Sequence, residues 1–308
     1  MISKKVPSIL KNTVHKFCRV VRLNGKEFHV PIGFEEPEYD IENIQKSSKV
    51  ILVRHANTVF NLEHDTFIAE HGYARDVLKI QYDEKHRDTP LSEFGIQQAK
   101  NASKYAKDLD VDLVLISPLK RTIQTAYYLL RNHPNKEKIN YVIHPGIREH
   151  LVGVSEMTDN WEDKLVNEYQ KYFPNLDSSL MKTKSGYYNE LFYCRDIQPE
   201  LRSQFQGKSK QEIEQLIRAS SEERFPKSAE IVEGTYDRVQ KVKKYIEKHI
   251  KNRLPEDQYK KVLVITHSLL LKVWLGNWSG MERPFTSLPK ETRLVKNCEF
   301  VADTTYKY

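Results

Sequence analysis

Short apolar runs that alternate with helical patterns constrain the fold of this chain more than any other feature. The apolar runs are residues 50–53, 113–116, 141–144 and 262–265, and residues 298–302 predict a last strand. The helical patterns cover about 92–108, 118–131, 228–250 and 268–276. This alternation predicts an α/β fold, a three-layer α/β/α sandwich whose sheet is mostly parallel and doubly wound.

Two of the predicted strands lead into a histidine. Residues 50–53 run into Arg54 and His55, and residues 262–265 run into Thr266 and His267. Open α/β sheets bind ligands at the carboxyl ends of their strands, so both histidines are expected at one edge of the sheet. A neutral imidazole is a competent nucleophile toward phosphorus, and the planar fork of Arg54 suits phosphate oxygens. The pair therefore favours a phosphate site over two histidines buried at the rim of a core.

A second arginine is expected at the same edge. After the strand at 113–116, Ser117 is predicted as an N-cap and Pro118 as the first helical residue, which places Arg121 in the opening turn. The free N–H groups and the dipole of a helix N-terminus hold phosphate. Glu149 follows the strand at 141–144 and offers a carboxyl at another strand end.

In this order, the motifs resemble those of the histidine phosphatase superfamily, in particular the branch that also contains the cofactor-dependent phosphoglycerate mutases. The resemblance runs from about Val50 to Ala302. It is carried by Arg54-His55 with Thr58 and Asn61, by Asp88, Pro90, Leu91, Gly95, Gln98 and Ala99, by Ser117-Pro118-Leu119 with Arg121, Gln124, Thr125 and Ala126, by Glu149 with Gly153, and by Thr266-His267.

The resemblance implies a role for each matching residue. His55 would be the nucleophile that forms a phosphohistidine, and Glu149 would be the general acid. The phosphate pocket would consist of Arg54, Arg121 and His267, with Thr58 and Asn61 beside it. These roles meet the needs of phosphoester cleavage: an in-line nucleophile, positive charge around the equatorial oxygens and a proton for the leaving alkoxide.

No metal and no cofactor is expected. The chain shows no cysteine pairs, no Asp-rich loop and no His-x-x-x-His pattern. Two arginines can supply the positive field that a metal ion would otherwise provide.

Two positions depart from the usual family pattern, which has glycine at both. Ala56 follows the nucleophile, and a Cβ there would cost about 1 kcal/mol or more if the backbone needed a positive φ. Ser268 follows the second histidine, and its hydroxyl is expected either to hold the phosphate or to cap the next helix.

The net charge of +7 is concentrated at the N-terminus. Residues 1–26 hold seven basic groups and no acid, so the remaining chain has 42 basic and 42 acidic residues. With no basic stripe outside this leader, no nucleic-acid partner is expected. No apolar run approaches 18 residues, so no transmembrane segment is expected either. Three widely spaced cysteines, an odd number, indicate an intracellular protein with reduced thiols.

The basic leader has three interpretations. Its apolar residues recur at helical spacing opposite the lysines, which resembles a mitochondrial transit peptide. It could equally be a helix docked on the segment that follows, or a contact for a membrane surface or a protein partner. That segment is a predicted hairpin, residues 18–23 and 27–32 around Asn24-Gly25, and residues 33–48 read as a linker. Cytoplasmic localisation is predicted, with mitochondrial import as the alternative.

Two long stretches interrupt the alternation of strands and helices. Residues 62–87 carry three histidines without ligand spacing and are predicted to be a solvated loop. Residues 155–227 hold ten aromatic residues in a mostly polar segment, and family members usually place their substrate-selecting cap here. The predicted organisation is thus residues 1–48 as leader, hairpin and linker, and residues 49–308 as a catalytic domain with a helical cap inserted at about 155–227.

Together these features predict a metal-independent phosphomonoester hydrolase that works through a phosphohistidine on His55, with Glu149 as general acid. The substrate is expected to be a phosphorylated small molecule or a phosphoprotein. A phosphoglycerate-type mutase is the alternative within the same chemistry. The competing class is a catalytically idle family member that serves as an interaction subunit of a larger assembly, with the N-terminal extension as its contact.

Overall fold

The computed structural model describes residues 18–306 with several gaps. Outside the described part lie residues 1–17, 32–36, 38, 73–76, 82, 158–166, 171, 174, 182–203, 205, 210–211, 213–215, 217–231 and 307–308. The expectations for the leader before Cys18 and for most of the cap therefore fall outside the described residues.

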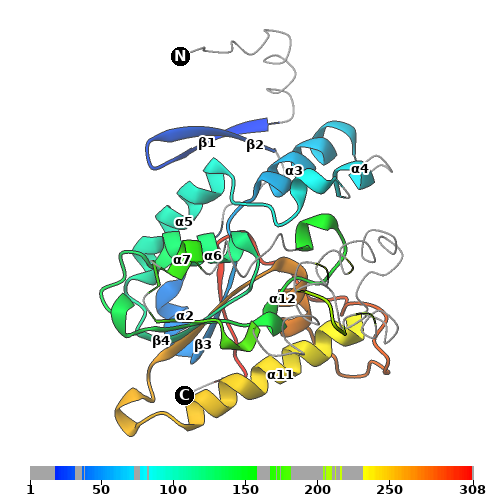
Figure 1. Ribbon diagram of the computed structural model, residues 1–308. Helices are drawn as coiled ribbons and strands as arrows, with labels where there is room; N and C mark the ends of the chain where they lie inside the picture. Colours follow the sequence, from blue (N-terminus) through cyan, green and yellow to red (C-terminus); the bar gives the residue numbers. More distant parts are fainter. Residues whose placement is uncertain are drawn as a thin grey trace.

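A six-stranded sheet forms the centre of the molecule (Figure 1). Across the sheet the strands are β6 (Leu176–Asp177), β5 (Asn140–Ile143), β4 (Val111–Ile116), β7 (Lys261–Thr266), β3 (Val50–Arg54) and β8 (Phe300–Ala302). All neighbours pair in parallel except β8, which runs antiparallel to β3. The predicted strands and their mostly parallel arrangement are confirmed.

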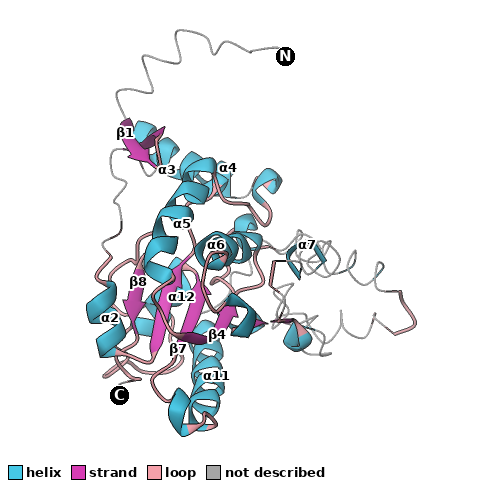
Figure 2. Ribbon diagram, turned by 90° about the vertical axis from the view of Figure 1, so that its left-hand side faces the viewer, coloured by secondary structure: helices cyan, strands magenta, loops and turns pink. Residues whose placement is uncertain are grey.

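Each central strand is covered on both faces. Side chains alternate along a strand, so Ile51 and Val53 of β3 enter one buried cluster while Val50 and Leu52 enter another. The first cluster includes residues of α5 (Glu93–Ala106) and α6 (Lys120–Leu130), and the second includes residues of α11 (Val232–Lys251) and α12 (Ser268–Leu275). Figure 2 shows the strands between these helices. The predicted three-layer sandwich is therefore confirmed, and it explains why the strands read as continuous apolar runs.

The predicted hairpin is also confirmed. Strands β1 (Cys18–Leu23) and β2 (Lys26–Pro31) pair antiparallel around Asn24 and Gly25, whose φ angles of 49° and 76° suit an Asn-Gly turn. Val21 and Val30 pack on Phe94 at the start of α5. The hairpin is thus fixed to the helix that covers the sheet.

Two predicted loops contain helices instead. In the predicted linker 33–48, α2 (Ile41–Ser47) begins at Asp40, whose side chain accepts a hydrogen bond from the Asn43 N–H. In the predicted solvated loop 62–87 lie α3 (Val59–His71), α4 (Val77–Gln81) and a 3₁₀ turn, η1 (Glu84–His86). The residues of α3 include none that is fully buried, so the helix has no apolar stripe for the sequence to reveal.

Shorter elements complete the described part of the chain. They are α7 (Asn167–Gln170), η2 (Lys136–Lys138), η3 (Pro145–Ile147), η4 (Val154–Glu156), η6 (Ser179–Met181) and η8 (Pro255–Asp257). Tyr169 and Phe173, two of the aromatic residues in the predicted cap, are buried in the cluster of α5 and α6. Among the described helices, none is long and apolar enough to cross a membrane.

Candidate active site

The carboxyl ends of the three central strands surround one cavity of about 800 Å³. It is lined by six of the seven residues that the sequence singled out, namely Arg54, His55, Thr58, Asn61, Arg121 and Glu149. The seventh, His267, is fully buried, and its ring lies 5.1 Å from that of His55. The structure therefore brings all seven together, at the edge of the sheet where the strand ends predict them.

His55 is held as a neutral imidazole with a defined tautomer. Its Nδ1 lies 2.8 Å from the carbonyl oxygen of Ala56, and because a carbonyl only accepts, Nδ1 carries the proton. Burial, and then the positive charges of Arg121 and Arg54, lower the pKa of His55 well below its usual value. The lone pair is thus on Nε2, which no hydrogen bond from the described residues engages.

Ala56 fits its position without strain. It is absent from the described non-glycine residues with positive φ, which are Asn24, Asp88 and Cys298. Its N–H donates to Oγ1 of Thr125, 3.0 Å away. The glycine usual at this position is therefore not needed here.

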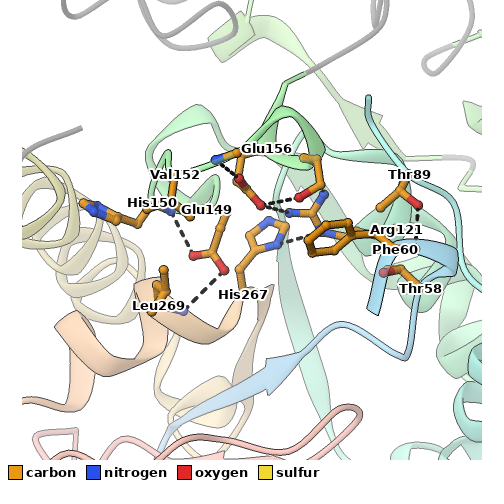
Figure 3. A network of polar contacts seen from close by, with 12 residues as sticks. Thr58, Phe60, Thr89, Arg121, Glu149, His150, Val152, Glu156, His267 and Leu269 are labelled. Carbon is orange, nitrogen blue, oxygen red and sulfur yellow. Dashed lines mark hydrogen bonds and ion pairs between the residues drawn. The ribbon is translucent and has the colours of Figure 1, made fainter. Parts of the chain in front are cut away.

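His267 lies behind the cavity, and both of its ring nitrogens are engaged. Nε of Arg121 donates to Nδ1 at 3.2 Å, so Nε2 carries the proton and donates to Oγ of Ser117 at 2.7 Å. Burial and the nearby positive charges, with Arg121 first, lower the pKa of His267 well below its usual value. In this arrangement His267 supports Arg121 from behind (Figure 3).

The prediction that Ser117 caps α6 is wrong, and the hydrogen bond between Ser117 and His267 explains why. The hydroxyl of Ser117 contacts His267, and the helix begins two residues later than expected, with Leu119 as its N-cap. The first helical N–H, that of Lys120, donates to Oδ1 of Asp88 at 2.8 Å. Arg121 still lies in the opening turn, as predicted.

Both arginines are anchored to backbone carbonyls. Nη1 of Arg121 donates to Ser155 O at 2.6 Å, and Nη1 of Arg54 donates to Val295 O at 2.9 Å. Nε of Arg54 is buried and has no hydrogen-bond partner within the described part of the chain. A buried guanidinium N–H without an acceptor is costly, and an anion in the cavity would remove that cost.

Thr58 and Asn61 form the start of α3. The Asn61 N–H donates to Oγ1 of Thr58 at 2.9 Å, and the Thr58 N–H donates to Oδ1 of Asn61 at 3.3 Å. This reciprocal capping box satisfies two N–H groups that the helix leaves unpaired. Both side chains thus have a structural role in the cavity wall.

Glu149 lies at the N-terminus of α12. Its carboxylate accepts from the N–H groups of His150 at 2.9 Å, Leu270 at 3.0 Å and Leu269 at 3.3 Å. The hydroxyl of Ser268 also donates to it, at 3.3 Å. His267 is the N-cap of α12, so Ser268 contacts the predicted acid and does not cap the helix.

A buried arginine on α11 holds the loop that carries Glu149. Nη1 of Arg238 donates to the carbonyl oxygens of Gly146 at 2.8 Å and Arg148 at 3.2 Å. Oγ1 of Thr266, at the end of β7, donates to Ile147 O at 2.7 Å. The position of Glu149 is therefore set by α11, α12 and the central sheet together.

Glu156 is a site residue that the sequence reading missed. It lines the cavity and lies 4.0 Å from Arg121, measured from Oε1 to Nη2. Burial raises the pKa of Glu156 to about 7, against the opposing effect of Arg121. The available signal was its place three residues after Gly153, whose N–H donates to Oε2 at 2.6 Å.

The described residues hold no group of three or more His, Cys, Asp or Glu side chains that could bind a metal ion. Within that part of the chain, the cavity lining combines two anchored arginines and Lys296 with three carboxyl groups, those of Asp65, Glu149 and Glu156.

The fold and the cavity define an α/β protein with two arginines and a buried neutral histidine at the carboxyl edge of its sheet. A family model described as the histidine phosphatase superfamily (branch 1) matches residues 50–185. This match, and the named relatives below, support the predicted resemblance to the superfamily and to its phosphoglycerate mutase-like branch.

Named relatives align with parts of the chain. A fructose-2,6-bisphosphatase TIGAR B of Danio rerio is 35% identical over 105 residues, which is 34% of this chain and 35% of the relative. A 2,3-bisphosphoglycerate-dependent phosphoglycerate mutase of Chlamydia muridarum is 29% identical over 53% of this chain and 62% of its own length. The chain thus matches less than two thirds of either relative. The mutase of the same name from Chlamydia pneumoniae is 28% identical over 72% of this chain and 80% of its own length.

Solved structures are similar at lower identity. Mycobacterial hydrolase 1 has a TM-score of 0.44 and 14% identity, covering 82% of this chain and 89% of its own. The alpha-ribazole phosphatase from Shigella flexneri has a TM-score of 0.42 and 18% identity, covering 82% of this chain and 87% of its own.

Proposed function

We propose that this protein is a metal-independent phosphomonoester hydrolase that forms a phosphohistidine on His55. The superfamily and the names of the relatives support a phosphatase or mutase activity. The observation that supports nucleophilic attack is the state of His55: Nδ1 is bonded to a backbone carbonyl, which leaves the Nε2 lone pair at a cavity shared with Arg54 and Arg121. An imidazole fixed in this way needs no base to activate it.

In the first step, Nε2 of His55 attacks phosphorus in line with the ester oxygen. The N–P bond forms as the P–O bond breaks, and a protonated Glu149 gives its proton to the leaving oxygen. Arg54 and Arg121 offset the charge on the equatorial oxygens. In the second step, water attacks the phosphohistidine and Glu149 takes up its proton. The N–P bond then breaks and inorganic phosphate leaves.

A mutase is the second candidate function. It is favoured by the alignment with the Chlamydia pneumoniae mutase, which covers 80% of that protein's length. A mutase must keep the phosphoryl group on His55 and return it to a sugar acid. Release of inorganic phosphate from a panel of phosphorylated metabolites and phosphopeptides, run beside phosphoglycerate isomerisation, tests both. Isomerisation without release would favour the mutase, and no activity on any substrate would favour the idle interaction subunit.

We expect activity to survive chelation. Because two arginines supply the positive field, turnover in EDTA should stay within about twofold of the untreated enzyme. The measurement is phosphate release before and after dialysis against the chelator. Loss of turnover that a divalent ion restores would contradict this mechanism.

We also propose a cytoplasmic location, with mitochondrial import as the alternative. Three widely spaced cysteines, an odd number, favour a reducing compartment, and Cys298 is a buried free thiol. Mass spectrometry of the native protein should then find Met1 or its processed neighbour at the N-terminus. A mature chain that begins between Phe17 and Lys26 would instead indicate a cleaved transit peptide.

A further inference from the structure

The cavity wall contains a second buried carboxyl, that of Glu156 in η4, besides the one that the mechanism uses. Only 8% of Glu156 is exposed. Its Oε2 accepts from the Gly153 N–H at 2.6 Å, and its Oε1 accepts from Oγ of Ser155 at 2.5 Å. Oε1 is also 4.0 Å from Nη2 of Arg121. Figure 3 shows this carboxyl beside the arginine that is expected to bind phosphate.

Within the described residues, the other hydrogen bonds of the Arg121 guanidinium go to groups of the protein itself. Nε donates to His267 and Nη1 donates to Ser155 O, so Nη2 is the end of the guanidinium that pairs with Glu156. A phosphoryl group that binds Arg121 brings at least one negative charge next to an ionised Glu156. Two anions would then share one buried cation, and in a site with little water that repulsion is strong.

We propose that Glu156 is a positioning residue that holds Arg121 while the pocket is empty and takes up one proton from solvent when a phosphoryl group binds. Protonation removes the competing charge, so that Arg121 acts on the substrate alone. The proton returns to solvent when phosphate leaves. This inference rests on the proposed function only through the anion pocket.

The surroundings of Glu156 keep the free energy of this proton exchange small near neutral pH. Burial raises its pKa to about 7, the charge of Glu149 acts in the same direction, and Arg121 with the Ser155 hydroxyl opposes both. The turn η1, which packs against η4, adds charged groups that are already paired: Glu84 with Arg87, and Lys85 with Glu63. His86 of the same turn has its pKa lowered, mainly by burial.

Sulfate binding tests the inference without turnover, because sulfate stays a dianion across the neutral range. Calorimetry in two buffers of different ionisation enthalpy gives both the affinity and the protons taken up. For the wild type we expect uptake of up to one proton per sulfate. As pH rises above about 7, the affinity should fall by up to roughly tenfold per pH unit. The affinity should level off once the pH exceeds the pKa that Glu156 has in the sulfate complex.

The variant Glu156→Gln keeps the size of the side chain and resembles the protonated form. It should bind sulfate with the affinity of the wild type at low pH, with no proton uptake and no pH dependence in this range. Glu149→Gln is the matched control, because it removes another carboxyl of the same cavity and keeps Glu156. The uptake should remain, with the fall in affinity moved to lower pH, since the charge of Glu149 raises the pKa of Glu156. Ser155→Ala removes a donor to the carboxylate, so the fall in affinity should move to higher pH.

Each result separates the two proposals. Uptake that persists in Glu156→Gln, or that disappears only in Glu149→Gln, would overturn the role of Glu156 and leave the proposed function intact. Absence of sulfate binding in the wild type at every pH would overturn the anion pocket, and with it the proposed function. If Glu156→Gln does not fold, an unshifted profile in Ser155→Ala would still overturn the inference.

Discussion

Replacing His55 with alanine should lower turnover by roughly 1,000-fold or more and abolish phosphate labelling of the protein. The reason is geometric: His55 lines the cavity near the charges of Arg121 and Arg54, and no hydrogen bond within the described residues engages its Nε2. Without it, no covalent intermediate can form. The measurement is brief incubation with labelled substrate, followed by quenching in base, because a phosphohistidine is labile in acid.

Two comparisons make the His55 result specific. His71→Ala removes an exposed histidine at the end of α3 and should leave both turnover and labelling unchanged. His267→Ala should weaken both without erasing either, because His267 supports Arg121 and has no contact with the cavity. Labelling that survives His55→Ala would place the nucleophile elsewhere in the chain.

Replacing Glu149 with glutamine should slow alkyl phosphates by roughly 100-fold or more and slow an aryl phosphate far less. Glutamine keeps the size and polarity of the side chain but cannot transfer the proton that an alkoxide needs. An aryl leaving group departs with little protonation. The measurement is the ratio of kcat/KM values for the two substrates in the variant and in the wild type.

Glu156→Gln provides the contrast for this experiment. A residue that acts through Arg121 should change both substrates by the same factor, because phosphate binding is common to them. Equal losses in Glu149→Gln would mean that Glu149 positions the pocket and donates no proton. The two carboxyl groups are therefore distinguished by dependence on the leaving group in one case and by dependence on pH in the other.

The central fold could be predicted because each strand carries a signal of its own. Buried parallel strands read as apolar runs, and the residue after each run lies at the carboxyl edge of the sheet. That rule brings His55 and His267 to one place, and a helix that begins soon after β4 adds Arg121. The Asn-Gly turn could also be predicted, because asparagine and glycine are the residues that tolerate the positive φ angles it requires.

What the sequence did not reveal depends on contacts between distant segments. Helix α3 has a capping box but no apolar stripe, so hydrophobic periodicity does not predict it. Serine is a residue type that N-caps favour, yet the hydroxyl of Ser117 contacts His267, 150 positions later. Asp88 instead accepts from the first N–H of α6, that of Lys120. Glu156 becomes a site residue only because Arg121 lies beside it in the folded chain. Patterns within a short stretch of sequence do not predict contacts between residues that are far apart along the chain.

The arginines around the site share one feature: each donates to at least one main-chain carbonyl oxygen. Arg54 bonds to residue 295, Arg121 to residue 155, and Arg238 to residues 146 and 148. Every amino acid has a carbonyl oxygen, so these anchors depend on the path of the loops and not on which side chains the loops carry. The side chains of the loops around the cavity can therefore change in evolution, and with them the choice of ligand, while the guanidinium groups keep their places.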